Sequence, residues 1–247
     1  MERAFRAVPN GTIRLTAVTV AGAAGYAVGS SWMVPGTGDM WRCRSAAVGA
    51  ARWVKIDVAD HPGYNVGRFF TPFGQGAPVA GITQLVGTMY LSYGVIKERI
   101  TVSQLQARVT TLSAGGNIQL AIYNSDPSTR RVSTLVAKTG NLSTTATGAV
   151  AGAFTGGDVT LEPGGYWFAC MVDNAVCVLL GNGTTSFNHL SFYGSTNGLG
   201  ASQAAQPAGV LISGQTFGTW PDDVTALNHS EATSRVSAMA FLVASVP

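Results

Sequence analysis

The chain has 247 residues, a formal net charge of +3 and only 11% charged residues, against roughly 25% in ordinary soluble domains. Its 15 basic residues form no run that would follow a phosphate backbone, which argues against nucleic-acid binding. The 31 glycines, together with the scarcity of Lys, Glu and Gln, favour short strands and tight turns over helices. A surface so poor in charge is typical of chains that cover themselves with further copies, so the composition also predicts a homo-oligomer.

Residues 1–66 are predicted to form a separate N-terminal region. Two segments, 40–45 and 51–56, each place a tryptophan within a short alternation of polar and apolar residues. This pattern predicts a β-hairpin in which Trp41 and Trp53 face each other. The Pro62-Gly63 pair favours a boundary at the end of this region.

Residues 67–247 are predicted to form one larger β domain. Its clearest strand is 117–123, where Ile118, Leu120 and Ile122 recur with a period of two on one face. The spacing of strands and turns is typical of a β-sandwich or jelly roll. Within this domain the predicted strands are 83–93, 100–112, 117–123, 132–137, 148–154, 158–161, 166–172, 175–180, 190–193, 209–213, 216–220 and 235–245.

Turn chemistry separates several of these strands. Residues 124–128 (Asn-Ser-Asp-Pro-Ser) predict a turn, because Asn and Asp side chains bond the nearby backbone and proline fixes φ. Residues 163–165 (Pro-Gly-Gly) predict a second tight turn. The stretch 181–231 shows little regular pattern, and long connections of this kind are usually functional or packed against a partner.

The cysteines and the N-terminus further limit the class of protein. Cys43, Cys170 and Cys177 are odd in number, which argues against a disulfide framework and favours buried free thiols. They form no Cys-x-x-Cys pair and no cluster with histidine, so no zinc site is expected. The apolar stretch 15–28 is too short and glycine-rich to cross a bilayer, and the charged start lacks the apolar core of a secretory signal.

Enzyme signatures are not found in the sequence. There is no Gly-x-Ser-x-Gly nucleophile turn, and the histidines His61, His189 and His229 lie in turn-like contexts. The glycine-rich stretches lack the Lys-Ser/Thr ending of a nucleotide-binding loop. We therefore expect neither catalysis nor a bound cofactor.

The Trp-Pro-Asp-Asp motif at 220–223 is the best candidate for ligand binding. A tryptophan can stack on a pyranose ring, and neighbouring carboxylates accept hydrogen bonds from its hydroxyl groups. The interpretation that the motif itself favours is a turn that is fixed by Pro221 and capped by Asp222. If the loops bind sugar, the predicted ligand-binding residues are Trp220, Asp222, Asp223, His189 and Tyr193.

Three further segments carry a family resemblance. They are the strand that ends in Ile-Tyr-Asn-Ser-Asp-Pro at 122–127, the short Ser-Thr-Leu-Val-Ala segment at 133–137, and Leu-Glu-Pro-Gly-Gly-Tyr-Trp-Phe at 161–168. With them, the stretch 117–174 resembles the C-terminal β-sandwich modules of bacteriophage tail-fibre and related virion proteins. The upstream stretch from Gly-Asp-Met-Trp at 38–41 through Ala-Arg-Trp-Val at 51–54 resembles a short hairpin unit of other phage fibre proteins.

This resemblance implies a jelly-roll or sandwich head, often trimeric, on the exterior of a virion. Residues 1–66 would attach it to other virion proteins, and loops of residues 67–247 would contact a glycan or protein of the bacterial surface, without membrane insertion. One alternative is a capsid or tail decoration or fibre-base protein with a purely structural role and no ligand. Another is an enzyme that acts on host polysaccharide.

Overall fold

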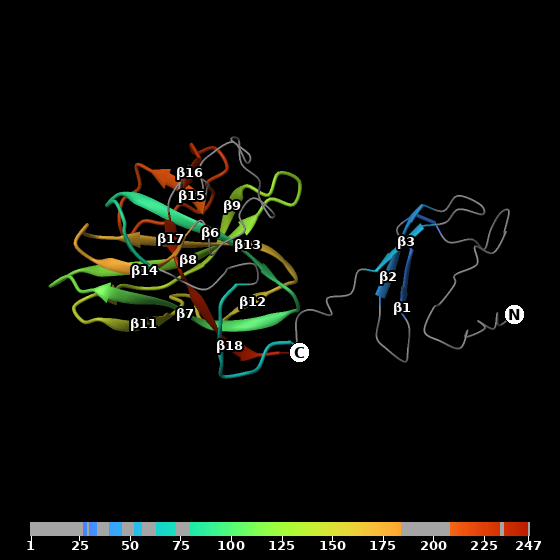
Figure 1. Ribbon diagram of the computed structural model, residues 1–247, viewed down its shortest axis with the longest axis horizontal. Helices are drawn as coiled ribbons and strands as arrows, with labels where there is room; N and C mark the ends of the chain where they lie inside the picture. The colour runs from blue at the N-terminus through green and yellow to red at the C-terminus, as the bar shows by residue number, and fades with distance from the viewer. Residues whose placement is uncertain are drawn as a thin grey trace, which may run out of the picture. The chain divides into compact units, whose positions relative to one another are not determined.

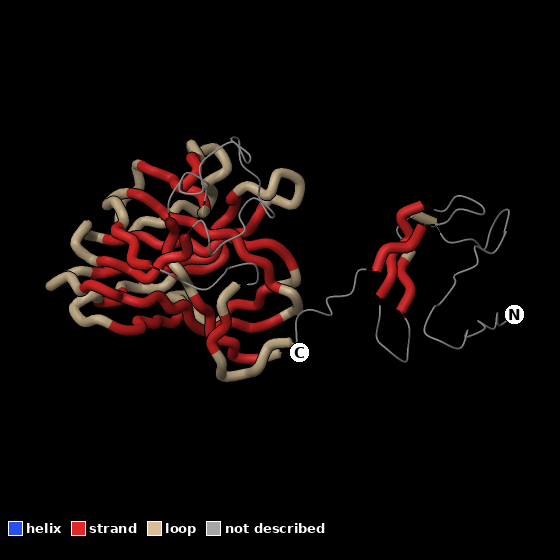
Figure 2. The backbone as a smooth tube through the Cα atoms, in the orientation of Figure 1, coloured by secondary structure: helices blue, strands red, loops and turns tan. Residues whose placement is uncertain are grey.

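A computed structural model describes residues 27–28, 30–33, 40–45, 52–55, 63–72, 80–183, 208–232 and 235–246. Every regular element within these ranges is a β-strand (Figure 2), which confirms the predicted all-β class. No helix long and apolar enough to cross a membrane occurs in this part of the chain. The chain divides into two compact units, Met1–Pro62 and Gly63–Pro247 (Figure 1), whereas the sequence placed the boundary between residues 66 and 67.

The first unit contains a three-stranded antiparallel sheet in the order β1-β2-β3. The predicted hairpin is present, and a further strand joins it. Trp41 pairs with Lys55 and Trp53 pairs with Cys43, so the predicted pairing of the two tryptophans is wrong. The strands are β1 (Ser31–Met33), β2 (Met40–Ser45) and β3 (Arg52–Lys55).

The second unit is a β-sandwich of two antiparallel sheets (Figure 1). One sheet has seven strands in the order β10-β8-β13-β6-β15-β16, and β9 also pairs with β8. Its strands are β6 (Thr88–Ile96), β8 (Asn117–Ser125), β9 (Val132–Lys138), β10 (Leu142–Ser143), β13 (Gly164–Val172), β15 (Gly209–Ser213) and β16 (Ser230–Ala232).

The other sheet has eight strands and is organised around β7, which pairs with β11, β12, β14 and β18. The pairing of β7 with β18 shifts register near Ser103, since Leu242 pairs with Gln104 and Val243 with Val102. The strands are β4 (Phe69–Phe70), β5 (Ala80–Thr83), β7 (Ile100–Thr111), β11 (Gly148–Ala153), β12 (Val159–Leu161), β14 (Val178–Gly183), β17 (Arg235–Ser237) and β18 (Ala240–Ser245).

The main hydrophobic core lies between the two sheets. Ile118, Leu120 and Ile122 point into it from β8, as their period of two predicts. Phe168 of β13 stacks on Phe241 of β18 with ring centroids 6.0 Å apart, which joins the two layers directly. Cys170 and Cys177 also lie in this core, so the predicted buried free thiols are confirmed.

A second core covers the opposite face of the seven-stranded sheet. Tyr123 and Trp167 are fully buried there, beneath Trp220 and Val224 from the segment that follows β15. Trp167 and Phe168 are neighbours on β13 whose side chains face opposite sides of the sheet, and both are fully buried. Residues 214–229 thus supply the outer layer, which explains why β13 is apolar on both faces.

Four predicted strands differ from those in the structure. Predicted strand 83–93 is interrupted at Gly87, whose φ of 75° turns the chain from β5 in one sheet to β6 in the other. The predicted strand 235–245 is likewise divided into β17 and β18. Residues 216–220 form a turn, and the predicted strand 175–180 begins only at Val178, as β14 of the eight-stranded sheet.

Candidate functional site

The Trp-Pro-Asp-Asp motif is part of the outer layer. Trp220 is 4% exposed, and its indole Nε1 donates a 2.7 Å hydrogen bond to Oε1 of Gln119. Tyr123 donates from its hydroxyl to the Pro221 carbonyl at 2.9 Å. Burial raises the pKa of this hydroxyl, and the nearby carboxylate of Asp222 adds to the increase. A buried indole offers no open face to a pyranose, so the stacking role predicted for Trp220 is not supported.

The backbone of residues 220–224, which we call the strap, runs beside β9. Leu135 N donates to the Asp222 carbonyl at 2.9 Å, and Val224 N donates to the Ser133 carbonyl at 3.1 Å. The motif therefore forms a bridge to β9 at Asp223, and Asp223, not the predicted Asp222, caps the backbone that follows. The strap covers part of the sheet face, and the buried indole of Trp220 holds it in place.

The remaining predicted ligand-binding residues do not gather around Trp220. Asp222 and Asp223 are exposed, and Asp223 Oδ1 accepts a 2.8 Å hydrogen bond from Thr225 N. Hydrogen bonds from Thr225 hold the pKa of Asp223 below its usual value. His189 and Tyr193 lie outside the described residues. Ligand binding by these four residues stays a prediction.

A polar depression of about 680 Å³ opens at one end of the seven-stranded sheet. Antiparallel pairing between β8 and β13 ends at Asn124 and Tyr166, while β13 continues along β6 to Gly164. Beyond Asn124 the chain that leaves β8 turns away from β13, and the depression lies between the two segments. The lining residues are Tyr93, Val95, Asn124, Ser125, Asp126, Pro127, Arg130, Gly164, Gly165 and Tyr166.

One wall of the depression is a turn that is organised by Asp126. Its Oδ1 accepts hydrogen bonds from the backbone N and the hydroxyl of both Ser128 and Thr129, at 2.7 to 2.9 Å. These bonds, with that of the Ser128 hydroxyl the strongest, lower the pKa of Asp126 to about 2. The carboxylate is therefore ionised at neutral pH, and the turn predicted for residues 124–128 is confirmed.

The turn closes at Arg130, which adopts a left-handed φ of 58°. Its N donates to the Asp126 carbonyl at 2.7 Å, and its carbonyl accepts a 3.1 Å hydrogen bond from the buried indole Nε1 of Trp167. A non-glycine residue in this conformation is costly and persists only where its surroundings fix it. The wall is thus tied directly to the second core.

The floor of the depression needs a glycine at position 165. A Cβ atom there would lie 2.1 Å from the Tyr93 hydroxyl oxygen and 2.7 Å from Cζ of that ring. The Tyr93 ring cannot easily retreat, because it packs edge-on against Trp167 with centroids 5.3 Å apart. At Gly164 the nearest atom to such a Cβ is 4.0 Å away.

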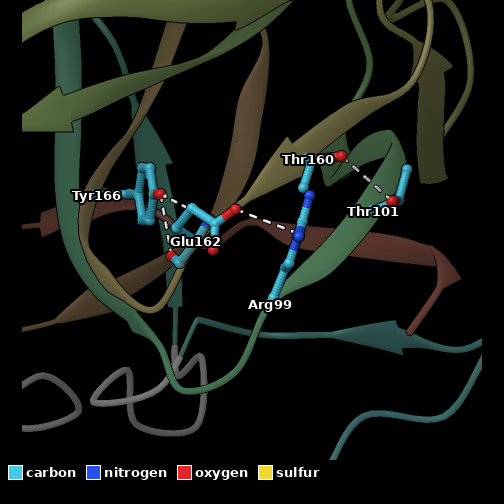
Figure 3. Close-up of polar contacts among 5 residues, drawn as sticks. All are labelled: Arg99, Thr101, Thr160, Glu162 and Tyr166. Atoms are coloured by element: carbon cyan, nitrogen blue, oxygen red, sulfur yellow. Dashed lines mark hydrogen bonds and ion pairs between the residues drawn. The ribbon is translucent and has the colours of Figure 1, made fainter. Parts of the chain in front are cut away.

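A polar clamp fixes the connection that leads from β12 into β13 (Figure 3). The Tyr166 hydroxyl donates to the Glu162 carbonyl at 3.0 Å and accepts from Glu162 N at 3.1 Å. The Glu162 carboxylate lies 3.2 Å from Arg99 Nε, an exposed ion pair worth about 0–1 kcal/mol. Nearby, the hydroxyls of Thr101 and Thr160 lie 3.4 Å apart. These contacts position the start of β13, which forms the floor.

The chemistry of the depression suits binding better than hydrolysis. Among the described residues that line it, Asp126 is the one carboxylate, whereas glycoside hydrolysis commonly uses a pair. The described ranges contain no group of three His, Cys, Asp or Glu side chains placed to hold a metal ion. His229 lies on another loop, where its Nε2 is 2.9 Å from the Val224 carbonyl and burial lowers its pKa.

Sequence reasoning missed this site although it identified the pieces. The turn at 124–128 was predicted, whereas Gly164 and Gly165 were assigned to a tight turn and instead begin strand β13. Nothing local in the sequence indicates that these two segments meet. Comparison with known proteins adds no assignment, since no family model and no curated protein matches this chain.

Proposed function

We propose that this chain is a virion structural protein, a fibre or spike whose β-sandwich head binds the bacterial host surface. The observation that carries this proposal is the pre-formed polar depression at one end of a charge-poor sandwich. Its wall and floor are fixed by hydrogen bonds and packing, so a ligand would order little on binding. Residues 1–66, which contain a separate small sheet, serve as the attachment region to other virion proteins.

The mechanism of this proposal is multivalent binding without catalysis. An open depression holds a single ligand weakly, but copies acting together can gain about 10²–10⁴ in avidity. The low charge of the chain favours such self-association, and a homotrimer is the assembly that we propose. The ligand is a host-surface glycan or protein, and the protein acts on the exterior of the particle.

Flow cytometry of fluorescently labelled full-length protein on a panel of intact bacteria tests this function. We expect saturable binding to at least one strain, with competition by an excess of unlabelled protein. Protein unfolded by heat before mixing serves as the control for non-specific adhesion. A folded protein that no strain retains above that control would contradict host attachment.

A second candidate is a capsid or tail decoration or fibre-base protein with no ligand. An exposed apolar ridge at the other end of the sandwich favours it: Leu85, Val86, Leu112 and Val176 are 63%, 51%, 45% and 64% exposed. These residues lie just beyond the ends of β5, β7 and β14, where Val178 of β14 pairs with both Thr83 and Thr111. An apolar surface of this kind suits a protein neighbour. A decoration protein would bind particles that lack it and would not bind cells.

A further inference from the structure

We infer that the depression between β8 and β13 binds one neutral pyranose unit of a glycan. This inference rests on the proposed function for its ligand class, and on the geometry of the site for its location. The residues that line it include Asp126, Arg130 and Asn124, whose side chains carry a carboxylate, a guanidinium and an amide, beside the backbone edge of two glycines. The Asn124 amide also donates a 2.9 Å hydrogen bond to the Thr134 hydroxyl. Its volume of about 680 Å³ falls within the range of roughly 300–1,000 Å³ typical of small-molecule sites.

The groups that line the depression match the hydroxyls of a sugar. Each sugar hydroxyl both donates and accepts hydrogen bonds, so it can donate to a carboxylate and accept from a guanidinium. Asp126 Oδ1 is fully used by the turn, but Oδ2 accepts no hydrogen bond from any described residue. The edge of β13 at Gly164 and Gly165 also has no β8 partner on this side. The residues that carry these groups, Asp126, Gly164 and Gly165, all line the depression.

Charge favours a neutral sugar over an acidic one. Asp126 and Arg130 belong to the same turn and both line the depression, so this wall carries one acidic and one basic residue. An anionic sugar would gain attraction from the guanidinium but meet repulsion from a carboxylate whose pKa of about 2 keeps it ionised. A neutral sugar uses both groups without that repulsion.

The wall is already in place before a ligand arrives. The hydrogen bonds onto Asp126 fix the turn, and the bond from Trp167 fixes the backbone of Arg130 against the core. A pre-organised site loses less conformational freedom on binding, which increases affinity without additional contacts.

Saturation-transfer NMR of the purified full-length protein tests this site. The probes are the methyl glycosides of glucose, galactose, mannose and N-acetylglucosamine, with methyl glucuronide as the anionic counterpart of glucose. The test variant is Arg130→Gly, since glycine adopts the left-handed φ of 58° without strain and removes the guanidinium. Arg131→Ala is the matched control, because it removes the same charge from the neighbouring exposed position.

We expect at least one neutral glycoside to bind saturably, with affinity about tenfold or more weaker in Arg130→Gly and unchanged in Arg131→Ala. No binding of any neutral glycoside, equal binding by Arg130→Gly, or a preference for glucuronide over glucoside would overturn the inference. Its failure is distinguishable from failure of the proposed function. If bacteria retain the wild type and Arg130→Gly equally, only the pocket assignment fails. If glycosides bind as expected but no strain retains the protein, only host attachment fails.

Discussion

Replacing Trp220 by alanine should destabilise the sandwich strongly. The indole is 4% exposed, packs at 6.2 Å from the Tyr123 ring, and donates to Gln119. Truncating a buried tryptophan to alanine costs about 3–5 kcal/mol. In a domain of this size each kcal/mol lowers Tm by about 2–4 °C, so we expect a fall of about 6–20 °C.

Thermal unfolding followed by circular dichroism measures this effect, and two further variants separate its causes. Trp220→Phe keeps most of the ring volume but leaves Gln119 Oε1 without its donor, at a cost of about 1–3 kcal/mol. Thr219→Ala changes an exposed neighbour and should leave Tm unchanged. The expected order of Tm is therefore Thr219→Ala highest, Trp220→Phe intermediate and Trp220→Ala lowest.

A different result would refute the role of Trp220 as an anchor. If Trp220→Ala kept the wild-type Tm but lost binding to cells, the indole would be an exposed stacking platform. The strap would then not be anchored over the sheet as described.

Three other predictions concern the depression and the thiols. Gly165→Ala should lower stability by about 1–3 kcal/mol because its Cβ would clash with Tyr93, while Gly164→Ala should be neutral; equal urea midpoints for the two variants would contradict this. Asp126 has a pKa of about 2 when folded, below its unfolded value of 3.8, so its stabilising contribution is present above about pH 4 and is lost as the pH falls towards 2. Asp126→Asn should flatten the acid limb of a plot of Tm against pH, and an unchanged limb would refute this. Burial raises the pKa of Cys170 to about 12, so this thiol should resist a disulfide reagent at pH 8 until denaturant is added, and rapid native labelling identified by mass spectrometry would contradict its burial.

Local features of the fold were predictable from sequence. The period-two pattern of Ile118, Leu120 and Ile122 identifies β8 because one face of the strand meets the core. The turn that begins at Asn124 follows from side chains that bond their own backbone, as Asp126 does here. Such signals are carried by neighbours in the chain, so no tertiary information is needed to interpret them.

Features that join distant segments were not predictable. Trp220 is buried because the strap crosses a sheet face whose strands lie about a hundred positions earlier, and its partner Gln119 carries no sequence mark of that contact. The depression likewise depends on where pairing between β8 and β13 stops, which register decides and composition does not. From sequence alone, an apolar residue on a loop is therefore expected to be exposed, because the layer that it forms is not evident from its neighbours in the chain.

Self-association is central to the proposed mechanism, because an open depression on one chain binds a single sugar only weakly. Multi-angle light scattering of the full-length protein at several concentrations tests it most directly. We expect a mass that does not change with concentration and equals three chains of 25.5 kDa each. A monomer mass throughout that range would contradict a multivalent attachment head.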